Sequence, residues 1–173
     1  MTKPALLLDV DGVLCPFANV DETQFEQLWL TDDRPKFLWD TWVWYTPKNR
    51  ERLARLSELF DLVWATGWEH EANKHLLEPH GLDYPLPVIE FSDKPLLGED
   101  RRFHNGHWKM PWILRWAEET QRALAWVDDD LVMPDASDWA DHRDKTIPTF
   151  VIKTDFNVGL TDGHVEELIE WAK

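Results

Sequence analysis

Three successive leucines followed by two closely spaced aspartates lie near the start of the chain, at residues 6–13 (Leu-Leu-Leu-Asp-Val-Asp-Gly-Val). The leucine run predicts a β-strand buried on both faces, which is typical of a parallel sheet covered by helices on both sides. Because residues two apart in a strand point the same way, Asp9 and Asp11 are expected to approach one small volume just before the chain turns at Gly12. Two carboxylates that close repel each other unless a cation lies between them or a reaction uses their different protonation states.

The residues alone leave two interpretations of this stretch open. Asp-Gly after a strand is also an ordinary turn sequence, which requires no catalytic role. A calcium-binding loop of the type D-x-D-x-D-G is excluded, because Val13 occupies the position where a third ligand is needed.

Apolar runs alternate with helical patterns along the rest of the chain. Further strands are expected at residues 61–65, 87–91, 123–127 and 149–153. Helices are expected after Thr46, from about Glu69 to Glu78, from Pro111, from Ser137 to about Lys145, and after Thr161. Because nearly all the strands are continuously apolar, we predict an α/β fold of the Rossmann-like three-layer α/β/α type with a parallel five-stranded sheet. At 173 residues, the chain is expected to form one domain over residues 1–173.

Residues 14–45 interrupt this alternation directly after the acidic turn. We expect a short helix at residues 21–30, with Phe25, Leu28 and Trp29 on one face, and a strand or hairpin at residues 37–45. An insert at this position is placed to cover a substrate, so we interpret it as a flap or minimal cap. The alternative is a structural flap that only buries its own tryptophans. The rest of the chain leaves no room for a large cap domain.

Net charge and cysteine content limit the cellular compartments and the classes of binding partner that we expect for this protein. The formal net charge of -15 argues against a broad nucleic-acid-binding surface but leaves room for a local basic patch. Cys15 is the only cysteine, which rules out an internal disulfide and is typical of a reducing compartment. Since the sequence has neither an export signal nor an 18-residue apolar span, we expect a cytoplasmic protein that does not cross a membrane. Its oligomeric state is left open.

Polar residues follow three of the predicted strands at their carboxyl ends. Asp9 follows the first strand, Thr66 the second and Asp128 the fourth. In parallel sheets, ligands bind beyond the carboxyl ends of the strands, near the point where the strand order reverses. These three residues are therefore expected to line one site.

Four short motifs resemble, in their order along the chain, those of the haloacid dehalogenase-like (HAD) hydrolases, a superfamily of phosphatases with an aspartate nucleophile. They are Asp9-Val10-Asp11-Gly12-Val13, the strand end Val63-Trp64-Ala65-Thr66-Gly67, Lys109 at a helix start, and Val127-Asp128-Asp129. The resemblance extends from Leu6 to about Asp130 and implies the HAD-like fold. It favours phosphoryl chemistry over dehalogenation, because the dehalogenases release a halide without a proton and do not need the acid that Asp11 supplies.

The resemblance implies two catalytic residues and a metal ion. Asp9 is similar to the family nucleophile, which attacks phosphorus and forms an aspartyl-phosphate. Asp11 is similar to the group that protonates the leaving oxygen and later takes a proton from the hydrolytic water. A Mg2+ cofactor is expected to be held by Asp9, the backbone carbonyl of Asp11, Asp128 and Asp129, the last either directly or through water.

The same resemblance implies three phosphate-binding groups, namely the Thr66 hydroxyl, the Gly67 amide and the Lys109 ammonium. Two of these assignments have a competitor. Thr66 is also suited to capping the next helix. Lys94 is a second candidate for the motif lysine, although it precedes an irregular proline-containing segment.

A second resemblance is narrower. The run from Trp64 to His70, with His107-Trp108-Lys109 and Gly159-Leu160-Thr161, is similar to a group of small tryptophan-rich bacterial members whose relatives occur in RNA-repair proteins. This similarity implies phosphatase activity on nucleic-acid ends, with Trp68 or Trp108 as a stacking face for a base. The local phosphate-binding rim would consist of Arg101, Arg102, His104 and Lys109.

The sequence therefore predicts a magnesium-dependent phosphatase whose partner is a phosphorylated substrate, either a small molecule or a nucleic-acid end. The alternatives are a polynucleotide end-processing phosphatase, a phosphotransferase, and a non-catalytic phosphate-binding or regulatory module. The presence of Asp9, Asp11 and Asp128 disfavours the non-catalytic alternative, since such a module has no need of them.

Overall fold

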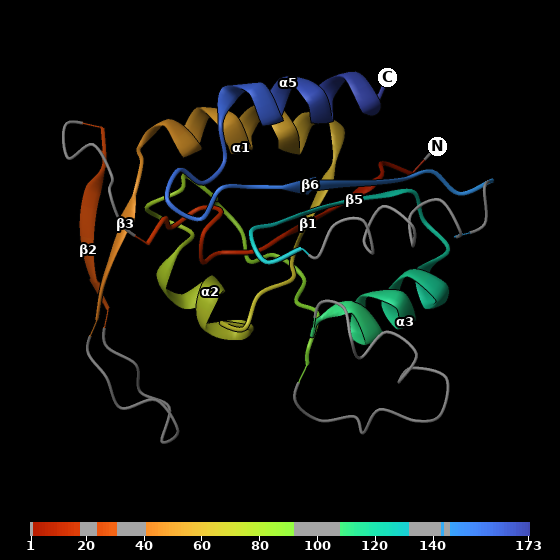
Figure 1. Cartoon of the computed structure of the whole chain (residues 1–173), viewed down its shortest axis with the longest axis horizontal. Helices are drawn as coiled ribbons and strands as arrows, with labels where there is room; N and C mark the ends of the chain where they lie inside the picture. Colours follow the sequence, from red (N-terminus) through yellow and green to blue (C-terminus); the bar gives the residue numbers. More distant parts are fainter. Residues whose placement is uncertain (1, 18–23, 31–40, 92–107, 132–142, 144–145) are drawn as a thin grey trace.

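A parallel sheet of four strands forms the centre of the molecule (Figure 1). The computed structural model describes residues 2–17, 24–30, 41–91, 108–131, 143 and 146–173. The strands are β1 (Ala5–Leu8), β4 (Asp61–Trp64), β5 (Leu124–Asp128) and β6 (Thr149–Lys153), in the spatial order β4-β1-β5-β6. Helices α1 (Lys48–Leu59) and α5 (Asp162–Trp171) cover one face, and α3 (Met110–Thr120) covers the other. This is the predicted three-layer α/β/α arrangement.

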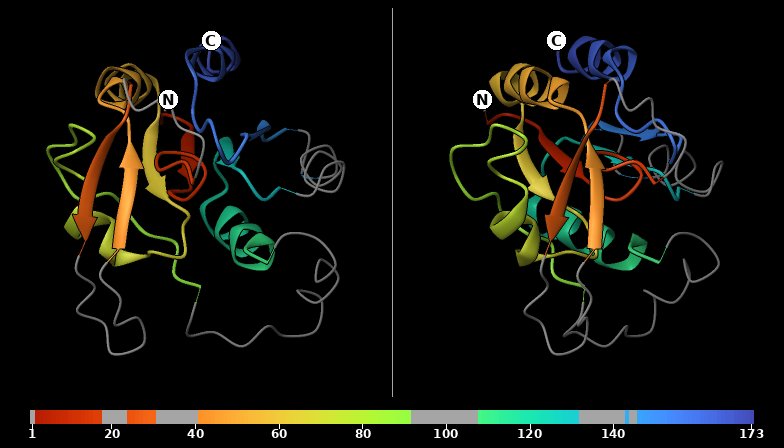
Figure 2. Two further views of the ribbon diagram at one scale, coloured as in Figure 1. Left: turned by 60° about the vertical axis from the view of Figure 1, so that its left-hand side comes forward. Right: turned by 90° about the vertical axis from the view of Figure 1, so that its left-hand side faces the viewer.

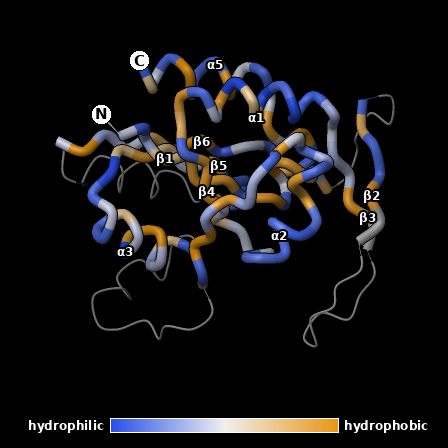
Figure 3. The backbone as a smooth tube through the Cα atoms, turned by 180° about the vertical axis from the view of Figure 1, so that it is seen from behind, coloured by the Kyte–Doolittle hydropathy of each residue, from blue (hydrophilic) through white to orange (hydrophobic). Residues whose placement is uncertain are grey.

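Strand β1 lies between β4 and β5 and is fully buried on both faces, as its leucine run predicts. Leu6 and Leu8 belong to the hydrophobic cluster that includes residues of α1 and α5, whereas Ala5 and Leu7 belong to the cluster beneath α3. The alternation follows from the two-residue period of an extended chain. In Figure 3 the central strands are largely hydrophobic, whereas hydrophilic residues alternate with hydrophobic ones along α1 and α5.

A fifth parallel strand is not found within the described part of the chain, so the prediction of five strands is not confirmed. The segment expected at 87–91 makes a single bridge, in which Val88 pairs with Trp64. The Pro87 carbonyl accepts a hydrogen bond from the Trp64 amide at 2.8 Å, and the Ile89 amide donates to the Trp64 carbonyl at 2.9 Å. Pro85 and Pro87 have no amide hydrogen, so the ladder does not extend toward the start of the segment, and beyond the bridge the Phe91 amide donates to the Glu69 side chain at 2.9 Å.

The predicted insert contains an antiparallel hairpin that forms a sheet of its own beside α1 (Figure 2). It consists of β2 (Glu26–Leu30) and β3 (Thr41–Tyr45). The strand predicted at 37–45 is therefore confirmed for its last five residues, and the helix predicted at 21–30 is wrong for residues 26–30. Cross-strand pairing outweighed the local helical pattern: Leu28 lies opposite Val43, both pack on the core, and the Tyr45 hydroxyl donates to Glu26 at 2.6 Å.

The remaining helices were predicted with different accuracy. Helix α2 (His70–His75) is shorter than the predicted 69–78. The last helix, α5, begins as predicted after Thr161, whose hydroxyl accepts a hydrogen bond from the His164 amide. The helix expected from Ser137 and most of the loop 92–108 lie outside the described residues. Among the described residues, no helix is long and apolar enough to cross a membrane.

His80, just after α2, is fully buried, and neither of its ring nitrogens has a hydrogen-bond partner within the described structure. Its ring meets that of Tyr45 edge-on, with the centroids 5.7 Å apart, so it joins the hairpin to the rest of the fold. Burial, helped by the charge of Arg50, lowers the pKa of His80 from 6.5 to about 4.

The free energy of unfolding is therefore expected to fall as the pH drops below 6.5 towards 4, because the unfolded chain takes up a proton at His80 and the folded chain does not. The loss from this one group is about 2 kcal/mol at pH 5. Between pH 7 and pH 5, the free energy of unfolding of His80→Leu, measured by urea denaturation, should fall by about 2 kcal/mol less than that of the wild type. Equal losses in the two proteins would show that His80 is not buried in its neutral form.

Candidate functional site

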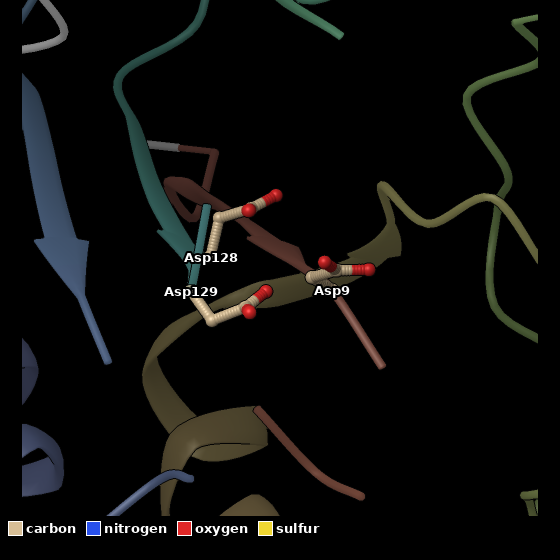
Figure 4. A group of neighbouring side chains, drawn as sticks. All are labelled: Asp9, Asp128 and Asp129. Atoms are coloured by element: carbon tan, nitrogen blue, oxygen red, sulfur yellow. The ribbon is translucent and has the colours of Figure 1, made fainter. Parts of the chain in front are cut away.

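Three carboxylates meet where β1 and β5 end, at the carboxyl edge of the sheet. Asp9 directly follows β1, Asp128 is the last residue of β5, and Asp129 comes next. One oxygen of each lies within 4.8 Å of the others, and Figure 4 shows the three side chains converging on one space. Because β1 and β5 are parallel neighbours in register, the convergence follows from the sheet topology.

Lys109 holds two of these carboxylates together. It is the residue before α3, and its side chain is only 3 % exposed. Its ammonium lies 2.6 Å from Oδ2 of Asp9 and 2.8 Å from Oδ2 of Asp128. A buried ammonium with two carboxylate partners is charge-assisted on both contacts and has little freedom to move. The structure thus places Lys109 where the motif lysine was predicted, whereas the competing Lys94 lies outside the described residues.

Burial and mutual repulsion set the electrostatics of the group. Burial raises the pKa of Asp9 to about 7, although the nearby ammonium of Lys109 lowers it in part. Burial and the charge of Asp128 raise the pKa of Asp129. Burial alone would lower the pKa of Lys109, but Asp9 and Asp128 outweigh it and raise the pKa above the usual value. When all three carboxylates are ionised, one ammonium leaves an excess of negative charge around the buried Asp9 and Asp128 and the half-buried Asp129.

The donor set fits a hard divalent cation. Asp9, Asp128 and Asp129 offer carboxylate oxygens only, which are the ligands that Mg2+ prefers, and neither a histidine nor a cysteine belongs to this group among the described residues. The excess negative charge is what such a cation would neutralise. The Asp11 side chain is not part of the group, and its predicted contribution through the backbone carbonyl stays a prediction.

Asp11 lies next to these carboxylates but has a different partner. Its Oδ2 accepts a hydrogen bond of 2.9 Å from the indole Nε1 of Trp68, on the segment that follows β4. Burial raises the pKa of Asp11, and the bond from Trp68 lowers it in part. A carboxyl group whose pKa is raised in this way is suited to exchanging a proton. The sequence suggested Trp68 or Trp108 as a stacking face for a base, and this stays a prediction; the structure places the polar edge of the Trp68 ring on Asp11.

Thr66 and Gly67 follow β4 in a tight turn. Thr66 is fully buried, and its hydroxyl accepts a hydrogen bond of 3.3 Å from the Trp68 amide, so its own hydrogen remains available to another acceptor. Gly67 is exposed. The N-cap position of α2 is occupied by Glu69, at φ +47° and without a side-chain capping hydrogen bond, so the competing interpretation of Thr66 as the cap of that helix is wrong. The predicted contacts of the Thr66 hydroxyl and the Gly67 amide with a phosphoryl group stay predictions.

Gly12 fits the site only because it has no side chain. Its φ is +67°, a conformation that favours glycine, and a Cβ at this position would lie 2.4 Å from Cγ of Asp129. The turn after β1 and the carboxylate after β5 therefore occupy adjoining space. The sequence indicated the turn at Gly12, but not the contact that forbids a side chain there.

The segment after β6 braces this turn, which the sequence did not reveal. The hydroxyl of Thr154 donates to the Gly12 carbonyl at 2.9 Å, and the Leu160 amide donates to the Val13 carbonyl at 2.7 Å. Gly159, at φ +73°, passes so close that a Cβ would lie 2.5 Å from the same Val13 oxygen. Thr154 directly follows β6, so the pattern of polar residues after strands that indicated Asp9 would also have indicated Thr154.

Several other predicted groups lie outside the described residues, namely Arg101, Arg102, His104 and His107. Lys109, the remaining member of the predicted rim, is buried on the carboxylates. Trp108 is half exposed and lies beside Gly67, with ring atoms 3.8 to 3.9 Å from where a Gly67 Cβ would be. Cys15 is buried, as expected of a small packing residue rather than a nucleophile.

Gly12→Ala is expected to weaken Mg2+ binding by about 10-fold or more, because the new methyl group displaces the Asp129 carboxylate. Titration calorimetry with MgCl2 measures the effect. The matched control is Gly163→Ala, where the added Cβ meets its nearest neighbour at 3.6 Å, and this variant should bind as the wild type does. Unchanged affinity in Gly12→Ala would show that Asp129 has no part in holding the ion.

Comparison with known families agrees with this geometry. A family model described as the HAD domain in Swiss Army Knife RNA repair proteins matches residues 5–165, which include every residue of the site. Comparisons with curated proteins and with solved structures gave no match. The family match covers nearly the whole chain and agrees with both resemblances seen in its sequence. The chain therefore belongs to the HAD domains of the RNA-repair group.

Proposed function

We propose that this protein is a magnesium-dependent phosphatase that hydrolyses phosphate monoesters through an aspartyl-phosphate on Asp9. The observation that supports this most strongly is the position of Asp9, which directly follows β1, contacts Lys109 at 2.6 Å and converges with Asp128 and Asp129. Membership in the HAD family supports hydrolase chemistry of this type.

The first chemical step transfers the phosphoryl group to the protein. A carboxylate oxygen of Asp9 attacks phosphorus, and the bond from phosphorus to the leaving oxygen breaks. The proton of the Asp11 carboxyl passes to that oxygen, so the product leaves as an alcohol. Lys109 offsets negative charge on Asp9 and on the phosphoryl group, while the Thr66 hydroxyl and the Gly67 amide hold phosphoryl oxygens.

The second step regenerates the protein. A water molecule attacks phosphorus, its proton passes to the Asp11 carboxylate, and the bond from phosphorus to Asp9 breaks. The products are inorganic phosphate and the original pair of aspartates. Asp9, Asp128 and Asp129, with the Asp11 carbonyl, would hold Mg2+, and the ion would supply the charge neutralisation that lets an anionic nucleophile approach an anionic ester.

Asp9→Asn is expected to abolish phosphate release from para-nitrophenyl phosphate, because an amide oxygen is too weak a nucleophile to attack phosphorus. EDTA should abolish release by the wild type, and added MgCl2 should restore it. Asp83→Asn, at an exposed position away from the site, serves as the control and should keep wild-type turnover. Full activity of Asp9→Asn would exclude the aspartyl-phosphate.

A nucleic-acid end is the substrate that the family match favours. Trp108 supports this choice, because its ring is half exposed beside Gly67 and has Lys109 5.5 Å from its centroid. A base next to the reacting phosphate would stack on this ring, which requires no broad basic surface. That property reconciles an RNA-end substrate with the net charge of -15.

We therefore expect 3′- or 5′-phosphorylated RNA oligonucleotides to be hydrolysed with a higher kcat/KM than glycerol phosphate or sugar phosphates. Trp108→Ala should reduce kcat/KM for the oligonucleotide by about 10-fold and leave glycerol phosphate nearly unchanged. An equal loss on both substrates would mean that Trp108 acts through Lys109 and not through a base.

Product analysis with an added acceptor alcohol separates two alternatives from the proposed hydrolase. A phosphotransferase would give a phosphorylated alcohol when an acceptor alcohol is present, whereas a hydrolase gives inorganic phosphate alone. A non-catalytic phosphate-binding or regulatory module would bind Mg2+ and phosphorylated ligands but release no phosphate from any ester.

A further inference from the structure

Trp68 makes the hydrogen bond that gives Asp11 a fixed orientation. Its indole Nε1 donates to Oδ2 of Asp11 at 2.9 Å, and no other hydrogen bond to the Asp11 side chain is found in the described part of the chain. The two residues lie 57 positions apart, one after β1 and the other after β4. Such a contact is set by the tertiary structure and not by local sequence.

The Trp68 ring has little freedom to move. It is half-buried and packs against the hydrophobic cluster that includes the core of β1. Its amide donates to the Thr66 hydroxyl at 3.3 Å, and the next amide, that of Glu69, donates to the Thr66 carbonyl at 3.0 Å. Glu69 has a φ of +47°, which is unfavourable for a non-glycine residue, and such strain persists only where the surroundings enforce it.

The chemistry of an indole limits what Asp11 can do. An indole nitrogen donates a hydrogen bond and cannot accept one, unlike a hydroxyl or an imidazole. The oxygen that faces Trp68 must therefore act as an acceptor whether Asp11 is charged or neutral. The carbonyl oxygen of a neutral carboxyl group is a better acceptor than its hydroxyl oxygen, so the indole favours the carbonyl form at Oδ2 and the acidic proton on Oδ1.

We propose that Trp68 is the positioning residue for the acid–base group, because it keeps the transferable proton on Oδ1 of Asp11 in both chemical steps. This inference rests on the proposed phosphatase function. In the first step the proton leaves Oδ1 for the departing oxygen as the phosphorus–oxygen bond breaks. In the second step Oδ1 receives a proton from the attacking water. Trp68 itself neither gains nor loses a proton in either step.

The dependence of rate on the leaving group tests the role of Trp68. Alcohols are poor leaving groups and need the proton, whereas 2,4-dinitrophenolate departs without it. Trp68→Phe keeps a ring but removes the N–H. It should lower kcat/KM for an alkyl phosphate on the order of 10- to 100-fold and for 2,4-dinitrophenyl phosphate by less than about 3-fold. A residue needed only for packing would lower both by the same factor.

Three further variants sharpen the comparison. Trp112→Phe is the matched control, because the Trp112 Nε1 is buried without a hydrogen-bond partner in the described structure, and it should leave both substrates unchanged. Asp11→Asn combined with Trp68→Phe should be no slower than Asp11→Asn alone, since the two residues act as one unit. Benzothienylalanine at position 68 keeps the bicyclic shape without the N–H. It should show the same selective loss of kcat/KM for the alkyl phosphate, and it tests the inference if Trp68→Phe folds poorly.

The outcomes separate this inference from the proposed function. A wild-type protein that hydrolyses none of the esters would overturn both. The role of Trp68 alone would be overturned by a second result. In that result the wild type is active, Asp11→Asn lowers mainly the hydrolysis of the alkyl ester, and the two position-68 variants either hydrolyse both esters as the wild type does or hydrolyse both more slowly by the same factor.

Discussion

The repulsion among Asp9, Asp128 and Asp129 is the constraint on which the rest of this site depends. Three carboxylates with oxygens within 4.8 Å of one another are unfavourable in a buried place unless positive charge offsets them. Lys109 supplies part of that positive charge from the start of α3. A divalent cation would offset the negative charge that remains. The carboxyl edge of the sheet therefore carries an excess of negative charge, which a divalent cation would neutralise before an anionic ester could approach.

Hydrophobic packing and hydrogen bonds to the backbone hold the acidic residues in this arrangement. Hydrophobic burial on both faces of β1 fixes where Asp9 emerges, because shifting the strand by one residue would exchange its two faces. Hydrogen bonds then fix the turn that follows, through Thr154 on Gly12 and Leu160 on Val13. The rigid sheet and the braced turn together set the separation between Asp9 and Asp11.

The sequence revealed most of this site because its residues follow strands. Asp9, Thr66 and Asp128 were found because each follows a continuous apolar run, which can be recognised from the local sequence. What the sequence did not reveal depends on contacts between distant segments: the Gly12 and Asp129 contact, the Thr154 brace and the Trp68 bond to Asp11. The strand at Glu26–Leu30 was mistaken for a helix for the same reason, because its partner lies eleven or more residues away.

The brace on the turn has a consequence for synthesis of the protein. The Gly12 carbonyl is made 142 residues before the Thr154 hydroxyl that bonds to it, and the Val13 carbonyl likewise precedes its partner, the Leu160 amide, by most of the domain. A nascent chain can thus assemble β1 against β4 before its acidic turn has acquired a defined shape. The acidic turn therefore acquires the hydrogen bonds that hold it only after the segment that follows β6 has been translated.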